Sequence, residues 1–255
     1  MRPAPFWQGP FWIAHRGAGK LAPENTLEAF REGARHGYRA FECDVKLSAD
    51  GVPFLLHDAS LDRTTTGRGS AAERAWAEIS RLDAGAWHSP AFAGEPPASL
   101  EAIAAFCQAH VHWLNIEIKP TPGSESHTGK EVARAARRLW AAHVPKPLLS
   151  SFQLAALEAA QAEAPELPRA LLIDSLWGGW MEAAQRLGCV AVVANHGLYQ
   201  PAVLEQIHQA GMAALAYTVN APDEAARLLA MGLDGLITDA VDRLGPGGPG
   251  GPGGN

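Results

Sequence analysis

The fold is decided by residues 169–219, which read RALLIDSLWGGWMEAAQRLGCVAVVANHGLYQPAVLEQIHQAGMAALAYTV. Short apolar runs stand at 169–173, 190–194 and 213–219, and the amphipathic stretches WMEAAQRLG and PAVLEQIHQAG separate them. A strand followed by a helix, repeated along the chain, is typical of a parallel sheet covered by helices. This stretch therefore predicts an α/β fold.

The same alternation extends in both directions through most of the 255 residues. Stretches such as ENTLEAFREGARHG and KEVARAARRLWAAH have the spacing of amphipathic helices and lie between the apolar runs. Eight repeats at this length favour a closed (β/α)8 TIM barrel over an open doubly wound sheet, because such a barrel takes roughly 250 residues. The eight predicted strands are Phe11–Ala14, Arg39–Val45, Trp113–Ile118, Leu148–Phe152, Arg169–Ile173, Val190–Ala194, Ala213–Val219 and Gly235–Thr238.

One repeat departs from the pattern. After Val45 the sequence KLSADGVPFLLHD (46–58) places an Ala-Asp-Gly turn between two apolar runs, which predicts a hairpin. Residues 59 to about 98 are rich in Gly, Ala, Ser, Thr and Pro, with one candidate short helix at Trp76–Leu82. We therefore expect a small insertion over about 46–98, between the second strand and the second helix. It would lie at the carboxyl ends of the strands, where barrels keep their active sites.

The chain is expected to form a single catalytic domain over residues 1–244, followed by a short tail. The last eleven residues, 245–255, read GPGGPGGPGGN and cannot build a core. Three PGG units are too short for a collagen helix, so the composition predicts a flexible tail.

Composition and charge exclude several classes of protein. A net charge of −6 argues against a general nucleic-acid or anionic-membrane binder. Three widely spaced cysteines do not make a disulfide framework. Prolines and polar residues interrupt the N-terminal apolar run, and no stretch reaches the roughly 18 apolar residues of a membrane span, so we expect a cytoplasmic protein without membrane insertion. The absence of GxGxxG, GxxxxGK[ST], HExxH and GxSxG motifs removes the commonest dinucleotide, nucleotide, zinc-protease and serine-hydrolase interpretations.

Acidic residues stand on the predicted strands where buried charge is costly. Glu42 and Asp44 lie two residues apart and share a strand face, as do Glu117 and Lys119. Inside a barrel these charges need compensation. A divalent cation bound by the three carboxylates would supply it, and oxygen ligands suit Mg²⁺ or Ca²⁺ better than Zn²⁺. The alternative is a layer of salt bridges in which Lys119 and Arg16 neutralise the acids.

Two histidines are expected beside these acids. His15 follows the first predicted strand, and folding the hairpin brings His57 back opposite the strand that carries Asp44. Two imidazoles near a metal suit general acid–base attack on a phosphate ester. Arg16 and Lys119 would then hold the phosphoryl oxygens. A purely structural role is the alternative for each histidine.

Three further polar positions lie at predicted loop ends. The sequence PENT, which contains Glu24 and Asn25, opens the first helix, and Asn25 with Glu28 fits a helix-capping box. A polar helix N-terminus above a barrel can instead face the substrate. Asn220 and Asp239 stand in late strand-to-helix loops, which are frequent phosphate sites in barrels, although ordinary helix capping is an equal alternative.

Taken in order, nine short motifs resemble the glycerophosphodiester phosphodiesterase family, and its cytosolic bacterial members most closely. The resemblance covers roughly residues 8–243, nearly the whole chain. The motifs are AHRG (14–17), APENT (22–26), ECD (42–44), LLHD (55–58), LDRTT (61–65), NIEIKP (115–120), LLSSF (148–152), YTVN (217–220) and DGLITD (234–239).

The resemblance implies a (β/α)8 barrel with an insertion after the second strand. It also implies metal-dependent hydrolysis of deacylated phospholipid headgroups, the glycerophosphodiesters, to sn-glycerol 3-phosphate and an alcohol. By position it implies an acid–base pair of His15 and His57, a site for Mg²⁺, Ca²⁺ or Mn²⁺, and phosphate and glycerol contacts. The residues concerned are Glu42, Asp44 and Glu117 for the metal, Arg16 and Lys119 for phosphate, and Tyr217, where the family often has Trp, on the glycerol side.

Two alternative functions remain at this point. A phospholipase-type barrel would act on intact lipid and would want an exposed apolar rim or a secretion signal. A barrel that binds metal or phosphate without catalysis would have no need of an acid–base pair.

Overall fold

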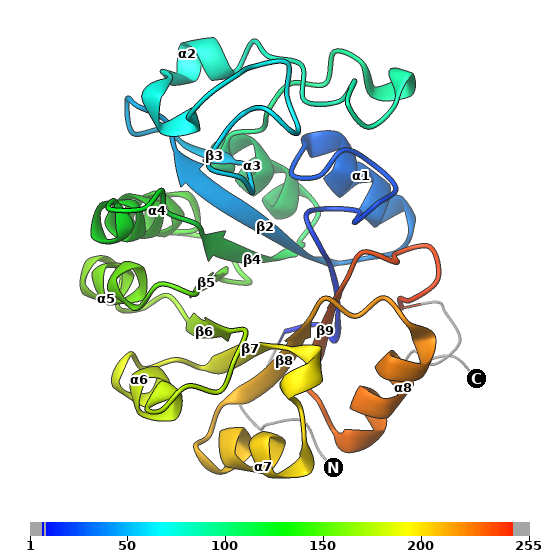
Figure 1. Ribbon diagram of the computed structural model, residues 1–255, viewed down its shortest axis with the longest axis vertical. Helices are drawn as coiled ribbons and strands as arrows, with labels where there is room; N and C mark the ends of the chain where they lie inside the picture. The colour runs from blue at the N-terminus through cyan, green and yellow to red at the C-terminus, as the bar shows by residue number, and fades with distance from the viewer. Residues whose placement is uncertain (1–6, 8, 247–255) are drawn as a thin grey trace.

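The computed structural model describes residues 7 and 9–246. Eight parallel strands form a closed barrel, because β1 pairs with β9 on one side and with β2 on the other (Figure 1). The predicted (β/α)8 fold is confirmed. The strands are β1 Trp12–Ala14, β2 Ala40–Leu47, β3 Pro53–Leu55, β4 Trp113–Ile118, β5 Leu148–Ser151, β6 Arg169–Ile173, β7 Ala191–Asn195, β8 Ala213–Tyr217 and β9 Gly235–Thr238.

Helices surround the barrel and follow its strands (Figure 1). Most begin and end within a few residues of the amphipathic stretches that predicted them. They are α1 Leu27–Arg35, α2 Trp76–Ile79, α3 Leu100–Ala109, α4 Glu125–Leu139, α5 Leu154–Glu163, α6 Trp180–Arg186, α7 Pro201–Gln209 and α8 Pro222–Met231. In the part of the chain that the structure describes, no helix is both long enough and apolar enough to cross a membrane.

Helix α4 differs from its prediction because it starts at Glu125, ahead of the amphipathic stretch that begins at Lys130. The sequence ESHTG looks polar, yet Thr128 and Gly129 are buried in this first part of the helix. A β-carbon at Gly129 would stand 2.1 Å from the carbonyl oxygen of Ala156 on α5. The close approach of α4 and α5 at Gly129 therefore accounts for burial in this polar first part of the helix.

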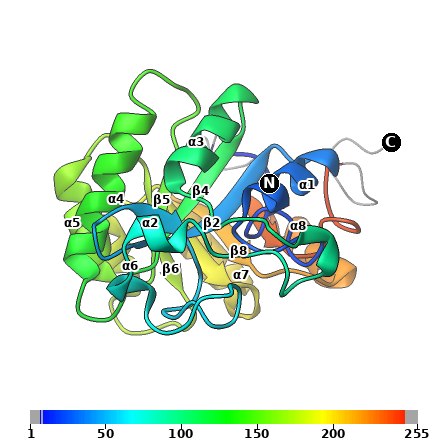
Figure 2. The same cartoon turned by 90° about the horizontal axis from the view of Figure 1, so that it is seen from above.

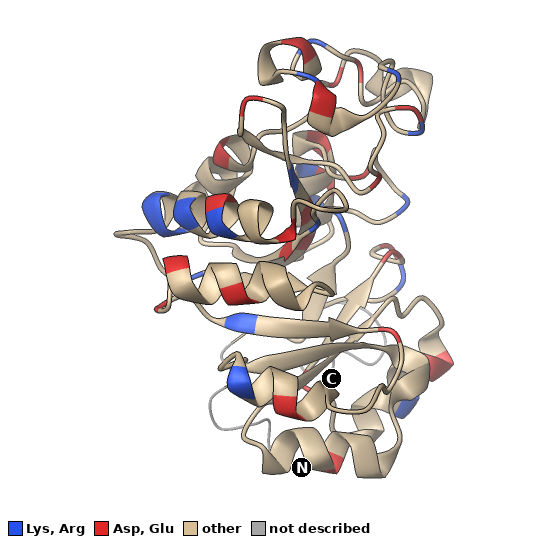
Figure 3. Ribbon diagram, turned by 60° about the vertical axis from the view of Figure 1, so that its left-hand side comes forward, with Lys and Arg blue, Asp and Glu red and all other residues tan. Residues whose placement is uncertain are grey.

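The barrel interior changes from apolar to polar along the strands. Ile13, Ala40 and Trp113 belong to the apolar cluster inside the barrel. Side chains two residues further along a strand share the same face, so the interior positions that follow include Glu42 and Asn115. Figure 3 shows that β5 to β9 are almost free of charged residues, and Arg169 is the exception within their ranges. Charge inside the strands is thus concentrated on β2 and β4.

The predicted hairpin is confirmed. Strand β3 pairs antiparallel with β2, with Val45 opposite Leu55. Gly51 in the connecting turn has φ +79°, a backbone conformation that favours glycine. The segment between β3 and α3 carries two 3-10 turns and α2, which is shorter than the predicted helix, and it lies at one side of the barrel beyond β3 (Figures 1 and 2). Its own apolar cluster consists of Phe54, Leu56, Leu61, Ala71 and Ile79.

Cys43, Cys107 and Cys189 are buried and free, which agrees with the expectation of no disulfide framework. The predicted tail at 245–255 lies, from residue 247 onward, outside the described residues.

Candidate active site

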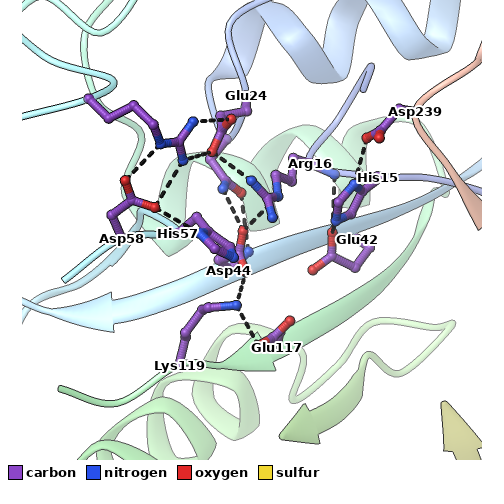
Figure 4. A network of polar contacts seen from close by, with 12 residues as sticks. His15, Arg16, Glu24, Glu42, Asp44, His57, Asp58, Glu117, Lys119 and Asp239 are labelled. Atoms are coloured by element: carbon purple, nitrogen blue, oxygen red, sulfur yellow. Dashed lines mark hydrogen bonds and ion pairs between the residues drawn. The ribbon is translucent and has the colours of Figure 1, made fainter. Parts of the chain in front are cut away.

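Three carboxylates converge at the carboxyl end of β2 and β4 (Figure 4). Glu42 and Asp44 project from β2, and Glu117 stands on β4 directly opposite Asp44 in the strand register. One oxygen from each lies within 4.8 Å of the others, and all three residues are at least nine-tenths buried. Among the described residues, Glu42 Oε1 is buried without a hydrogen-bond partner. All the candidate ligand atoms are oxygens, and one of them is buried without a hydrogen-bond partner. Such a group of ligands suits a hard divalent cation.

Crowding of negative charge is visible in the pKa values of the three acids. Burial raises the pKa of Glu42 to about 8, and repulsion from Asp44 adds to the rise. Burial and the charge of Asp44 also raise the pKa of Glu117. For Asp44, burial acts in the same direction, but Arg16 and Lys119 outweigh it and hold its pKa below the ordinary value. Burial and repulsion from Asp44 therefore raise the pKa of two of the three acids, whereas Arg16 and Lys119 keep that of the third low.

Arg16 and Lys119 also make the salt bridges expected of the alternative interpretation. Lys119 Nζ lies 2.9 Å from Glu117 Oε1 and 3.2 Å from Asp44 Oδ1. Arg16 Nε lies 3.2 Å from Asp44 Oδ2. Salt bridges and an acid group able to hold a cation therefore coexist, and both cations line the cavity described below.

His15 enters the site directly after β1. Its Nδ1 lies 2.6 Å from Asp239 Oδ1, and its Nε2 lies 3.7 Å from Glu42 Oε2. Burial acts to lower the pKa of His15, but Asp239 and Glu42 outweigh it and raise that pKa. Asp239 is in place because β1 and β9 pair with Ala14 opposite Thr238. The residue after each strand end is thereby brought alongside the other.

His57 enters from the opposite side, through the hairpin. The backbone N–H of Leu56 donates to the carbonyl of Asp44 at 3.0 Å, which brings the next residue over the acidic cluster. His57 Nδ1 lies 2.8 Å from Asp58 Oδ1. Burial lowers the pKa of His57. In each histidine, Nδ1 therefore lies within hydrogen-bond distance of a carboxylate oxygen. Nε2 is then the ring nitrogen that remains for a bound molecule.

A single cavity of about 190 Å³ joins these groups. Both histidines, Arg16, Lys119 and two of the carboxylates line one side of it. Phe152, Leu172 and Tyr217 make an apolar wall, with the rings of Phe152 and Tyr217 in edge-to-face contact at 5.8 Å. The Tyr217 hydroxyl donates to the carbonyl of Ile173 at 3.1 Å and so fixes the ring. A small molecule with one anionic and one less polar part fits such a cavity.

Most of the chain matches a known protein family. Residues 15–243 match the glycerophosphoryl diester phosphodiesterase family. The chain belongs to this family. The resemblance drawn from the nine motifs is confirmed, and the family is one of hydrolases.

Individual members of the glycerophosphoryl diester phosphodiesterase family align along nearly their whole length. A glycerophosphodiester phosphodiesterase of Caldanaerobacter subterraneus is 31% identical over 91% of this chain and 95% of its own. A phosphodiesterase from Oleispira antarctica, solved in complex with the product sn-glycerol-3-phosphate, is 33% identical, has a TM-score of 0.84 and covers 91% of this chain and 93% of its own. A glycerophosphodiester phosphodiesterase from Agrobacterium tumefaciens is 28% identical, with a TM-score of 0.76 over 91% of this chain and 97% of its own.

Asn25 corrects one expectation. It does not cap α1, because the side chain of Thr26 accepts the capping hydrogen bond from the backbone N–H of Ala29. The backbone at Asn25 has φ +61°, and its amide turns toward β2. There Asn25 Nδ2 donates to Asp44 Oδ2 at 2.8 Å, and its Oδ1 accepts from the backbone N–H of Asp44 at 3.1 Å. The predicted capping box with Glu28 is therefore wrong, and the alternative, a position facing the site, describes Asn25 better.

Asn220 corrects a second expectation, since it does not cap α8, whose N-terminal cap is Ala221. Its Nδ2 donates to Asp239 Oδ2 at 3.0 Å, and its Oδ1 accepts from the backbone N–H of Asp239 at 2.8 Å. The carboxylate of Asp239 is held between Asn220 and His15, and the position of this loop as a phosphate site stays a prediction.

Two residues to which the sequence assigned no role belong to the same network in this family member. Asp58 holds His57, and Arg63 holds Asp58. Asp58 had a signal, because it directly follows a predicted catalytic histidine in LLHD. Arg63 had only its place in the LDRTT motif, with no spacing that would tie it to the acids.

Proposed function

We propose that the protein hydrolyses glycerophosphodiesters, the deacylated headgroups of phospholipids, to sn-glycerol 3-phosphate and a free alcohol. The observation that supports this most is the opening of two carboxylate-held histidines and the acidic cluster onto one cavity. The product bound by the Oleispira relative supports the same products here. We further propose that residues 1–244 act as one catalytic domain, with 46–98 as its insertion.

A divalent cation would be held by Glu42, Asp44 and Glu117. The buried, unpartnered Glu42 Oε1 and the all-oxygen donor set favour Mg²⁺ or Ca²⁺, with Mn²⁺ as a further candidate. When bound, the cation supplies Lewis-acid charge withdrawal from a phosphate oxygen. Asn25 would keep Asp44 oriented, since it contacts both the side chain and the backbone of that residue.

The histidines would move protons during the reaction. One takes the proton of the attacking oxygen and the other protonates the leaving alkoxide. Asp58 and Asp239 accept from the two Nδ1 atoms, so that each Nε2 is free to exchange a proton with a bound molecule.

Arg16 and Lys119 would bind the phosphoryl oxygens, and Glu24 would orient Arg16 through its 2.8 Å contact. The apolar wall with Tyr217 would face the glycerol. Asn220 would keep Asp239 turned toward His15.

Product analysis by ³¹P NMR tests the proposal with glycerophosphocholine as substrate. The expected final signal is that of glycerol 3-phosphate, with choline released in equal amount. A transient cyclic phosphate would indicate that the neighbouring glycerol hydroxyl attacks first, and its absence would indicate water. Phosphocholine as the phosphorus-containing product, or no turnover with any added divalent cation, would contradict the proposal.

A further inference from the structure

Arg63 connects two parts of the site that lie on different elements. It comes from the segment between β3 and α2, which also carries Asp58, whereas Glu24 precedes α1. Its guanidinium makes a two-bond contact with each carboxylate. Arg63 Nε and Nη2 donate to Asp58 at 2.7 and 3.0 Å, and Nη1 and Nη2 donate to Glu24 at 2.8 and 2.7 Å. Figure 4 labels the two carboxylates, Asp58 and Glu24, and marks their contacts with dashed lines.

Each of these carboxylates in turn holds a group that faces the cavity. Asp58 Oδ1 contacts His57 Nδ1 at 2.8 Å. Glu24 Oε1 accepts from Arg16 Nη1 at 2.8 Å. His57 and Arg16 both line the cavity. One guanidinium therefore stands behind a proposed proton-transfer residue and a proposed phosphate ligand at once.

The backbone around Arg63 is built to hold it in place. Leu61 and Thr65, on either side of it in the sequence, are buried in the insertion. The Thr65 hydroxyl donates to the carbonyl of Leu61 at 2.6 Å and accepts from the backbone N–H of Gly67 at 3.0 Å. The backbone N–H of Leu61 donates to the carbonyl of Gly69 at 3.0 Å. This closed turn fixes the residue from which the guanidinium extends.

The chemistry of the contact fixes the tautomer of His57. Asp58 accepts from Arg63 through both oxygens and stays ionised, so it has no proton to donate. The hydrogen between Asp58 and His57 must therefore reside on Nδ1. In the neutral imidazole this leaves the Nε2 lone pair unprotonated, which is the form that a proton acceptor needs.

We propose that Arg63 is a positioning residue for the hydrolysis: by holding the Asp58 carboxylate against Nδ1 it favours the Nδ1–H tautomer of His57, and through Glu24 it orients Arg16. The inference rests on the proposed function for its effect on turnover, whereas the tautomer can be read without turnover.

The test compares Arg63→Gln and Arg63→Lys with Arg68→Gln as a matched control on the same insertion. Arg68 is exposed, and its ion pair with Asp62 is long, at 3.9 Å. With glycerophosphocholine as substrate, Arg63→Gln should lower kcat by about 10–100-fold. Losses of this size are typical when a residue that orients a functional side chain is replaced. Its KM should change less than kcat. Arg63→Lys should recover only part of the loss. It restores the positive charge, but an ammonium cannot contact both carboxylates with two bonds each as the planar guanidinium does. Arg68→Gln should match the wild type.

The ¹⁵N chemical shifts of the His57 imidazole provide the second readout. Above the pKa of His57 the wild type should show the Nδ1–H tautomer, and Arg63→Gln should show a shift toward Nε2–H. The thermal unfolding midpoint of each variant is measured alongside to show that the fold is intact. An unchanged tautomer in Arg63→Gln, or an equal loss of kcat in Arg63→Gln and Arg68→Gln, would overturn the inference. If the wild type turned over no glycerophosphodiester, the proposed function would fail while the tautomer still decided the role of Arg63.

Discussion

His15 and Asp239 stand 224 positions apart in the chain, yet His15 Nδ1 lies 2.6 Å from Asp239 Oδ1. The contact joins the start of the barrel to its end, since β1 and β9 are the strands on which the sheet closes. The same contact sets the direction in which the other nitrogen of His15 faces, toward Glu42. The strand pairing that closes the barrel therefore also orients a proposed catalytic residue.

Replacing Asp239 by Asn should therefore impair turnover more than folding. The amide keeps the shape but offers a donor as well as an acceptor, so it no longer enforces Nδ1–H on His15. We expect kcat to fall by about 10–100-fold with the thermal midpoint changed by only a few degrees. Asp242→Asn is the matched control, because Asp242 is exposed in the same segment. Equal activity of the two variants would contradict this role for Asp239.

The proposed proton transfer predicts a large and selective effect of the histidines. His15→Ala and His57→Ala should each reduce kcat by about 10²–10⁴-fold, the range of general acid–base catalysis. Metal affinity measured by calorimetry should stay close to that of the wild type, and the exposed His143→Ala should behave as the wild type in both assays. Loss of the metal in either variant with an intact fold would make that histidine a ligand instead.

His112 predicts how stability depends on acid. The residue is buried against Phe41 and Phe106, and burial lowers its pKa to about 4. The unfolded chain binds a proton near pH 6.5, so between about pH 6.5 and 4 the unfolded state holds more protons and the free energy of unfolding falls as pH falls. The contribution of this one group is about 1–3 kcal/mol over that interval.

Urea unfolding at pH 7 and pH 5 measures this contribution. His112→Gln should lose less stability between the two values than the wild type, whereas His143→Gln, a substitution of an exposed histidine, should keep the wild-type difference. The same pH difference in all three proteins would show that His112 does not carry the effect.

Substrate range follows from where the binding groups lie. Arg16, Lys119 and the acidic cluster would contact glycerol phosphate, which every deacylated headgroup shares. We expect kcat/KM for glycerophosphocholine, glycerophosphoethanolamine and glycerophosphoglycerol to agree within about tenfold, equivalent to roughly 1.4 kcal/mol. Diacyl phospholipid in mixed micelles should react far more slowly, because the cavity holds about 190 Å³. Faster turnover of the diacyl lipid would favour a phospholipase.

Some features of the structure could be predicted from the pattern of residues in the sequence. Apolar periodicity predicted the bounds of β4, β6 and β9 as the structure has them, because these strands are buried on both faces. The two-residue spacing of Glu42 and Asp44 likewise predicted that they would share a face. Such features depend on neighbours in the sequence, and they are accessible without a structure.

Features that depend on distant neighbours were not accessible. The first part of α4 is buried where Gly129 contacts α5, and the role of Asn25 is set by a left-handed backbone that turns it toward Asp44. From local rules the helical stretch began only at Lys130, and Asn25 was a helix cap. The partnership of His15 with Asp239 likewise requires the closed barrel.

Removal and return of the divalent cation decide whether the protein is a metal-dependent phosphodiesterase. Release of glycerol 3-phosphate from glycerophosphocholine should be measured with protein treated with EDTA and dialysed, before and after Mg²⁺, Mn²⁺ or Ca²⁺ is added back. Glu42→Gln should be compared with Glu101→Gln, a substitution of an exposed acid on α3. We expect no release from the metal-free protein, recovery with at least one cation, and no recovery in Glu42→Gln. Full activity in a sample shown to be free of metal would contradict this expectation.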